Sequence, residues 1–442
     1  MLQTLINAWK VPELRKKLIF TALIILVFRV GANLPVPFLD IGETGIIDTT
    51  TNSFMSYLTM MTGEAFNYGT LFAMSITPYI NSSIIIQLLT VAIPALERLS
   101  KEGEEGRKKI TEITRYLAVA LALVQSTAYF LYIRSGGFLA KAVDGTAYTG
   151  FGAVFQALVV IFTLAGGCTL IIWLGETINN KGIGNGISMI LFAGIVSRIP
   201  VTVTVMYQHF QQRGANLFIM PLAALTMLLM IAYIVWMDNA EQRIPVQYAK
   251  RVVGRKMYGG QNSYIPIKVN MSGVLPIIFA SSILSIPPTI NMFVQASATS
   301  KPGLYKWLFH PFEQDHWFYA IIYFLLIIFF AYFYSAIQYN PIEMANNLRK
   351  NGGTVPFVRP GKPTSDYIAK VLSKMVLLGA LLLSVVALFP ILFSHFAKLV
   401  GADAAGLSLG GTSVIILVGV ALETVRQLES QMMMRHYKGF LD

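Results

Sequence analysis

The feature that most constrains this chain is a series of long apolar runs joined by polar segments. A helix of about 20 apolar residues crosses the hydrocarbon core of a bilayer and satisfies its own backbone hydrogen bonds. Of the 442 residues, 55% are hydrophobic and only 13% are charged, which excludes an ordinary soluble protein. The sequence therefore predicts an all-α polytopic membrane protein with ten transmembrane helices. The runs lie roughly at 18–34, 71–95, 113–133, 152–175, 185–206, 217–237, 272–293, 318–338, 370–394 and 410–427.

The basic residues are distributed unevenly among the segments that join these runs. With the N-terminus in the cytoplasm, the cytoplasmic segments hold 26 of the 34 Lys and Arg residues, and Arg29 lies within the first run. Basic loops resist translocation, so this bias predicts the orientation. An even number of spans then places both termini, including the amphipathic segment 1–17, in the cytoplasm. The opposite side receives the other seven: Arg134, Lys141, Arg198, Arg213, Lys301, Lys306 and Lys398.

Two of the cytoplasmic segments, 238–270 and 340–369, are far longer than the usual connections in a helical bundle. Both are rich in Arg, Lys, Gly and Pro, and aromatic residues such as Tyr258 and Phe357 interrupt them. Loops of this length are usually functional or disordered. The apolar interruptions favour ordered hairpins over a flexible linker.

Few side chains that could carry chemistry lie within the runs. The single cysteine, Cys168, and five scattered histidines lack the spacing of a metal site, so we expect no metal and no cofactor. No nucleophile lies near a base at depth, so we expect no enzyme. We expect Arg29 to reach outward or to pair with a neighbouring carbonyl. The glycine-rich string KGIGNG at 181–186 predicts a tight turn between two runs.

Uncharged polar residues enter the second, third and seventh runs. Such residues commonly hydrogen-bond between helices. We expect Pro78 and Pro276 to break the helices near two of these groups, which favours a functional seam over simple packing. The residues are Asn81, Ser82, Ser83, Gln87, Gln125, Ser281 and Ser282.

The segment 53–68 lies between the first two runs and is too short and too polar to cross a membrane alone. A half-helix that dips into the membrane and an interfacial amphipathic helix both fit its composition. The pattern alone favours the interfacial helix.

Seven strings spread along the chain resemble the SecY family, the channel subunit of the bacterial Sec protein translocon. They occur in the family's order and spacing. The strings are SITPYINSSIIIQLLT (75–90), KEGEEGRKKI (101–110), WLGETINNKGIGNGISMILFAGIV (173–196), IPIKVNMSGVLPIIFASSI (265–283), NPIEMANNLRKNGG (340–353), FVRPGKPT (357–364) and GGTSVIILVGVALET (410–424).

The resemblance implies two inverted five-helix halves, residues 18–206 and 207–442, around a central pore in the bacterial cytoplasmic membrane. Members of the family translocate unfolded secretory polypeptides and release membrane proteins sideways into lipid, without a cofactor. A secondary transporter of a small solute is the alternative, and it would need a titratable residue at depth.

The resemblance also assigns candidate site residues. It implies a narrow apolar ring, which excludes water and ions, a plug at 53–68 that seats against the ring, and a lateral gate that opens to lipid. The ring residues are Ile76, Ile80, Ile187, Leu191, Ile278 and Ile416. The plug residues are Phe54, Tyr57, Leu58 and Met61, and the gate residues are Asn81, Gln87, Gln125 and Ile286.

The two long basic loops resemble a docking surface for the ribosome and for the SecA motor. A projecting cationic hairpin attracts the phosphates of ribosomal RNA. The candidates are Arg251, Arg255 and Lys256 in the first loop and Arg359 in the second, within the FVRPG motif. The resemblance adds the SecE and SecG subunits, signal peptides, nascent chains and membrane lipid as partners.

Overall fold

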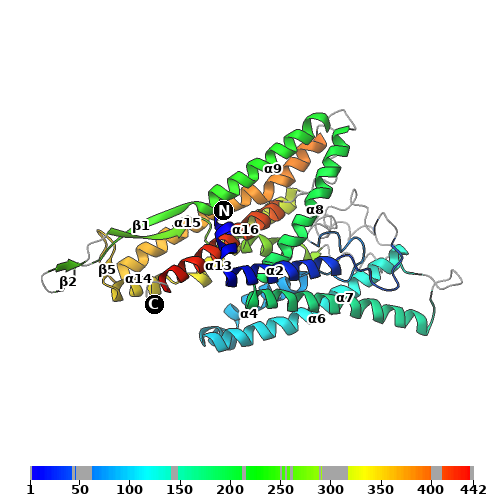
Figure 1. The fold of residues 1–442 in the computed structure, drawn as a ribbon, viewed down its shortest axis with the longest axis horizontal. Helices are drawn as coiled ribbons and strands as arrows, with labels where there is room; N and C mark the ends of the chain where they lie inside the picture. Colours follow the sequence, from blue (N-terminus) through cyan, green and yellow to red (C-terminus); the bar gives the residue numbers. More distant parts are fainter. Residues whose placement is uncertain are drawn as a thin grey trace.

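The computed structural model describes residues 2–41, 45, 62–140, 148–211, 216–248, 251–253, 256–258, 262–287, 290, 317–399 and 411–438. Most of these residues are helical (Figure 1). The helices are α1 (Leu2–Lys10), α2 (Pro12–Gly31), α4 (Thr77–Ala92), α5 (Pro94–Lys101), α6 (Glu104–Gly136), α7 (Phe151–Lys181), α8 (Gly186–Gln211), α9 (Asn216–Asn239), α10 (Leu275–Leu284), α13 (Trp317–Gln338), α14 (Pro341–Lys350), α15 (Lys362–Leu399) and α16 (Gly411–Lys438).

Each of the ten predicted runs overlaps one helix, which confirms the helical class. These helices are α2, α4, α6, α7, α8, α9, α10, α13, α15 and α16. Within the described part of the chain, 6 helices are long and apolar enough to span a membrane alone, and the bent pair α4–α5 would raise the number to 7.

The second and seventh runs differ from the expectation at their prolines. Pro78 lies in the first turn of α4 and Pro276 in the first turn of α10. The first turn of a helix tolerates proline because its N–H groups have no partner within the helix. The prediction that these prolines break helices was therefore wrong, since each marks a helix start. The bend in this region comes later, at Ile93, where the axes of α4 and α5 differ by 102°.

The turn between α7 and α8 is as tight as the glycine-rich string predicts. Asn185 caps α8, since its Oδ1 accepts the backbone N–H of Ile187 at 3.1 Å. A Cβ atom on Gly186 would lie 1.9 Å from the carbonyl oxygen of Gly175, so only glycine allows the two helices to approach this closely. The turn fixes where α8 begins, and α8 carries two of the candidate ring residues.

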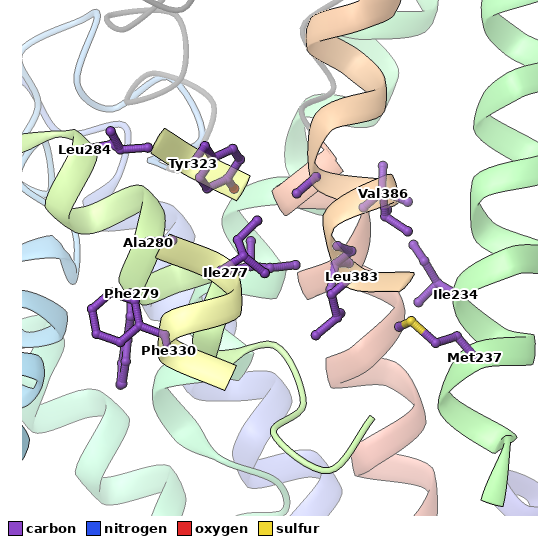
Figure 2. Close-up of a cluster of buried hydrophobic side chains, with 14 of the residues drawn as sticks. Ile234, Met237, Ile277, Phe279, Ala280, Leu284, Tyr323, Phe330, Leu383 and Val386 are labelled. Carbon is purple, nitrogen blue, oxygen red and sulfur yellow. The ribbon is translucent and has the colours of Figure 1, made fainter. Parts of the chain in front are cut away.

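The core of the second half is an apolar cluster among α9, α10, α13, α15 and α16, which Ile84 of α4 joins from the first half (Figure 2). Phe279 of α10 meets Phe330 of α13 edge to face, with ring centroids 5.6 Å apart. Because this cluster holds α10 in place, it positions the ring residue Ile278. The labelled members are Ile234 and Met237 of α9, Ile277, Phe279, Ala280 and Leu284 of α10, Tyr323 and Phe330 of α13, and Leu383 and Val386 of α15.

The two long loops join in one small sheet at an end of the helical bundle (Figure 1). Strand β1 (Glu241–Tyr248) pairs antiparallel with β4 (Asn262–Lys268), and β2 (Arg251–Val253) with β3 (Lys256–Tyr258) lies beyond them. Strand β5 (Gly353–Thr354) of the second loop pairs with β1. The prediction of an ordered hairpin is confirmed for the first loop. It was wrong for the second, which supplies α14 and the edge strand β5.

Candidate functional site

The six aliphatic residues proposed for the ring lie together in one apolar cluster. Three are buried in it, with exposed fractions of 0% for Ile76, 4% for Leu191 and 1% for Ile416. The other three, Ile80, Ile187 and Ile278, are partly buried and pack against the same cluster.

Four helices position these side chains. Ile76 and Ile80 lie one turn apart at the start of α4, and Ile187 and Leu191 lie one turn apart on α8. Ile278 comes from α10, and Ile416 comes from α16. Both halves of the chain therefore contribute to one apolar cluster.

Phe54, Tyr57, Leu58 and Met61, the candidate plug residues, lie outside the described residues. The described remainder, Thr62–Tyr68, consists of turns, so the expected helix does not reach it. Ala65 is buried in the ring cluster, and Phe66 packs on Tyr129 of α6 with ring centroids 4.7 Å apart. The Tyr129 hydroxyl also donates to the carbonyl oxygen of Phe66.

Two arginines hold the beginning of this segment. Arg29 Nη1 donates to the carbonyl oxygen of Gly63 at 3.3 Å, which is the carbonyl pairing that we expected as one alternative. Arg198 forms an ion pair with Glu64 at 3.4 Å. The structure places Arg198 within α8, as the predicted run 185–206 did, and its assignment to the side opposite the cytoplasm stays a prediction. We did not predict the Glu64–Arg198 ion pair from the sequence. The signal available was that each of these charged residues lies within an otherwise apolar stretch.

The four candidate gate residues are not joined to one another. Gln87 Nε2 donates to Ser83 Oγ at 3.2 Å within α4, and Asn81 Oδ1 is buried with no hydrogen-bond partner among the described residues. Gln125 lies on α6, and Ile286, just beyond α10, is 49% exposed. The gate assignment of these four residues therefore stays a prediction.

The polar residue that joins helices here is Ser82. Its hydroxyl donates to the carbonyl oxygen of Thr114 at 2.6 Å and so fastens α4 to α6. This bond has the packing role that we considered for the polar residues of the runs.

The described docking candidates lie on the separate two-stranded sheet of β2 and β3 and on the loop that follows β5. Arg251 lies on β2 and Lys256 on β3, whereas Arg255 lies outside the described residues. Arg359 is exposed, and its carbonyl oxygen accepts the hydroxyl of Thr364 at 2.8 Å. Nearby, Phe357 is fully exposed with a φ of 64°, a strained conformation for a bulky residue.

A small apolar core supports this surface. Val246 of β1 and Leu348 of α14 are buried together with Val355, which follows β5. The surface is therefore a folded platform. Among the described residues, no group of three His, Cys, Asp or Glu side chains could hold a metal ion.

Comparisons with known proteins agree with this geometry. The SecY family profile matches residues 70–425. The protein translocase subunit SecY of Streptomyces galbus is 41% identical over 446 residues, with 100% of both chains covered.

Solved structures share the fold. A structure described as a protein conducting channel aligns with a TM-score of 0.63 and 18% identity, over 95% of this chain and 92% of that chain. Sec61 from the canine ribosome-channel complex of the endoplasmic reticulum aligns with a TM-score of 0.62 and 16% identity, over 95% and 92% of the two chains. The chain therefore belongs to the SecY family of protein translocase subunits, and its fold is that of a protein-conducting channel.

Proposed function

We propose that unfolded polypeptides cross the membrane through the ring of six aliphatic side chains. The observation that carries this proposal is the convergence of the six on one apolar cluster from four helices of both halves. A narrow apolar constriction dewets and so blocks ions, while aliphatic side chains can close around a moving chain. A passing polypeptide meets no fixed polar group that would bind it. The channel performs no chemistry, and its partners supply the energy.

The segment 53–68 serves as the plug, and the seam between α4 and α10 serves as the lateral gate. The burial of Ala65 beside the ring supports the first role, because the segment reaches the constriction. Direct contact between α4 and α10 supports the second. Polar bonds between membrane helices are individually weak, so a signal peptide or an apolar segment can separate the two helices at little cost.

The platform of β1, β4 and β5 is the docking surface for the ribosome and the motor ATPase SecA. The lysine and arginine bias supports a position for it, with both termini, on the cytoplasmic side of the bacterial cytoplasmic membrane. The likeness to a ribosome-bound Sec61 supports the ribosome as a partner. Exposed Phe357 beside Arg359 suits a protein interface, in which an aromatic residue acts as an anchor. The SecE and SecG subunits complete the assembly.

Photocrosslinking tests the ring. A secretory chain is stalled during export, with a photoreactive residue placed in the channel at position Ile80, Ile278 or Ile416. Adducts are expected at these positions and not at Ile321 of α13, a control that is 57% exposed on the outside of the bundle. No adduct at any of the three ring positions, with normal incorporation of the probe, would refute the assignment.

A further inference from the structure

Two consecutive residues, Gly63 and Glu64, are held by arginines from two different helices. The Arg29 guanidinium of α2 donates to the Gly63 carbonyl oxygen at 3.3 Å. The Arg198 guanidinium of α8 lies 3.4 Å from the Glu64 carboxylate. These residues lie at the start of Thr62–Ser75, the segment that leads to the ring and that we call the stalk. We call the two contacts together the clasp.

The stalk lies directly on α8 at this point. A Cβ atom on Gly63 would be 2.9 Å from Ser197 Oγ and 3.0 Å from the carbonyl oxygen of Gly194. Gly63 also has a φ of 63°, which favours glycine. The close approach brings both arginines within reach of the stalk.

Glu64 has a φ of 75°, which is unfavourable for a residue with a side chain. Such a conformation persists only where the surroundings compensate for it. The structure shows two compensations: the ion pair with Arg198, and the backbone hydrogen bonds that the Glu64 carbonyl oxygen accepts from Asn67 and Tyr68 at 2.9 and 3.2 Å. The Glu64 and Arg198 side chains are only 30% and 18% exposed, and Arg198 Nε is buried with no other partner among the described residues. Displacing the stalk would leave a charge within a membrane helix without its partner, which is unfavourable.

Beyond the clasp, the stalk contacts α2 again as well as α6, since Phe72 stacks on Phe28 of α2 with ring centroids 5.6 Å apart. Ala65, next to Glu64, is buried in the ring cluster. The following residue, Phe66, packs on Tyr129 of α6 in a separate cluster and accepts its hydroxyl hydrogen bond. Gly63 and Glu64 are thus the part of the stalk that the two arginines hold, and Phe66 attaches the adjoining part to α6.

We propose that Arg29 and Arg198 are positioning residues that keep the stalk seated beside the ring and thereby favour the closed channel. Opening breaks the clasp before the stalk can move. This inference rests on the proposed function, in which the ring is the constriction that the stalk helps to seal.

Charge removal tests the clasp. Glu64→Gln and Arg198→Gln keep most of each side chain but abolish the ion pair. In the assembled complex in liposomes, both are expected to raise the resting ion flux about tenfold, the order expected when a partly buried charge loses its partner. Both should also increase export of a substrate with a defective signal sequence. The control is Glu176→Gln, which breaks the 2.7 Å pair with Arg115 between α6 and α7 and should leave both quantities unchanged.

Reversing the pair separates a positioning role from a merely structural one. Exchanging the two charges, as Glu64→Arg with Arg198→Glu, should return the flux toward the native value. A double variant as leaky as the single variants would overturn the proposal.

A reversible cross-link gives a second measurement, in which one variant is compared with itself in its oxidised and reduced states. Gly63→Cys with Ser197→Cys, in a chain whose only cysteine, Cys168, is replaced by alanine, should form a disulfide, given the 2.9 Å approach. Oxidation should stop export, and reduction should restore it. Normal export with the disulfide formed would overturn the proposal.

Failure of the clasp and failure of the ring give different results. If the Glu64→Gln variant has the native resting ion flux while the Ile416→Ala variant leaks, the proposed clasp is overturned and the ring is supported. Native flux in Ile416→Ala overturns the ring itself.

Discussion

Replacing Ile416 by alanine tests how much of the closed channel's stability comes from packing within the ring. The Ile416 side chain is 1% exposed and belongs to the cluster that holds all six ring residues. Truncating a buried isoleucine to alanine costs about 2–5 kcal/mol. Some of this packing persists in the open channel. The substitution therefore changes the free-energy difference between the closed and open states by about the lower end of that range. Since every 1.4 kcal/mol is a factor of ten, a difference of about 2 kcal/mol raises the open fraction about 30-fold.

The measurement is the resting ion flux per channel in liposomes that contain the purified complex and no translocating chain. Ile321→Ala of α13 is the matched control, because its side chain is 57% exposed and its truncation opens no cavity in the ring. The reasoning is refuted if Ile416→Ala assembles normally and its flux stays within about threefold of the native value, since that bounds the difference below about 0.7 kcal/mol.

Three further predictions concern other parts of the chain. Arg359→Glu should impair motor-driven export, measured in inverted vesicles. Assembly should stay normal, because the hydrogen bond that Arg359 makes to Thr364 uses its carbonyl oxygen and not its side chain. Normal export would remove Arg359 from the docking surface. Gly186→Ala should destabilise the protein by at least about 1–3 kcal/mol, the cost typical of overpacking, and so lower its thermal unfolding temperature in detergent. Gly166→Ala, at a position with open space around it, should leave the temperature unchanged. Equal unfolding temperatures for the two variants would contradict the close approach of α7 and α8. Arg426→Gln breaks a partly exposed 2.8 Å ion pair to Asp238. We expect the same assay to show a loss of stability of about 1 kcal/mol or less. A larger loss would show that solvent screens the pair poorly.

The apolar runs predicted the helices because the signal is local. Each run had to satisfy its backbone within itself, so its length and composition indicated a helix without reference to any neighbour. The ring residues carry no such signal. An isoleucine such as Ile278 in a membrane helix usually packs or faces lipid, and only the resemblance to a family singled it out.

The features that the sequence did not predict are contacts between distant segments. The pairing of β5 with β1 joins Thr354 to Gln247, and no pattern in either loop specifies its partner. The Glu64–Arg198 pair likewise joins a turn to a helix far along the chain. Pro78 was misread for another reason. Proline breaks a helix interior but starts a helix well, and the apolar run gave no sign of where the helix begins.

The platform and the ring are connected by short, closely packed segments. Strand β4 leads through residues 269–274 to α10, which carries Ile278. Val269 donates its backbone N–H to the carbonyl oxygen of Ala240 at 2.9 Å, which closes the base of the sheet. Gly379 of α15 lies against the same residue, because a Cβ atom there would be 2.3 Å from the Val269 carbonyl oxygen. If a partner docks on the sheet as proposed, packed backbone would transmit its effect to α10 and α15, and a displaced α10 would shift one side of the proposed ring and of the seam with α4.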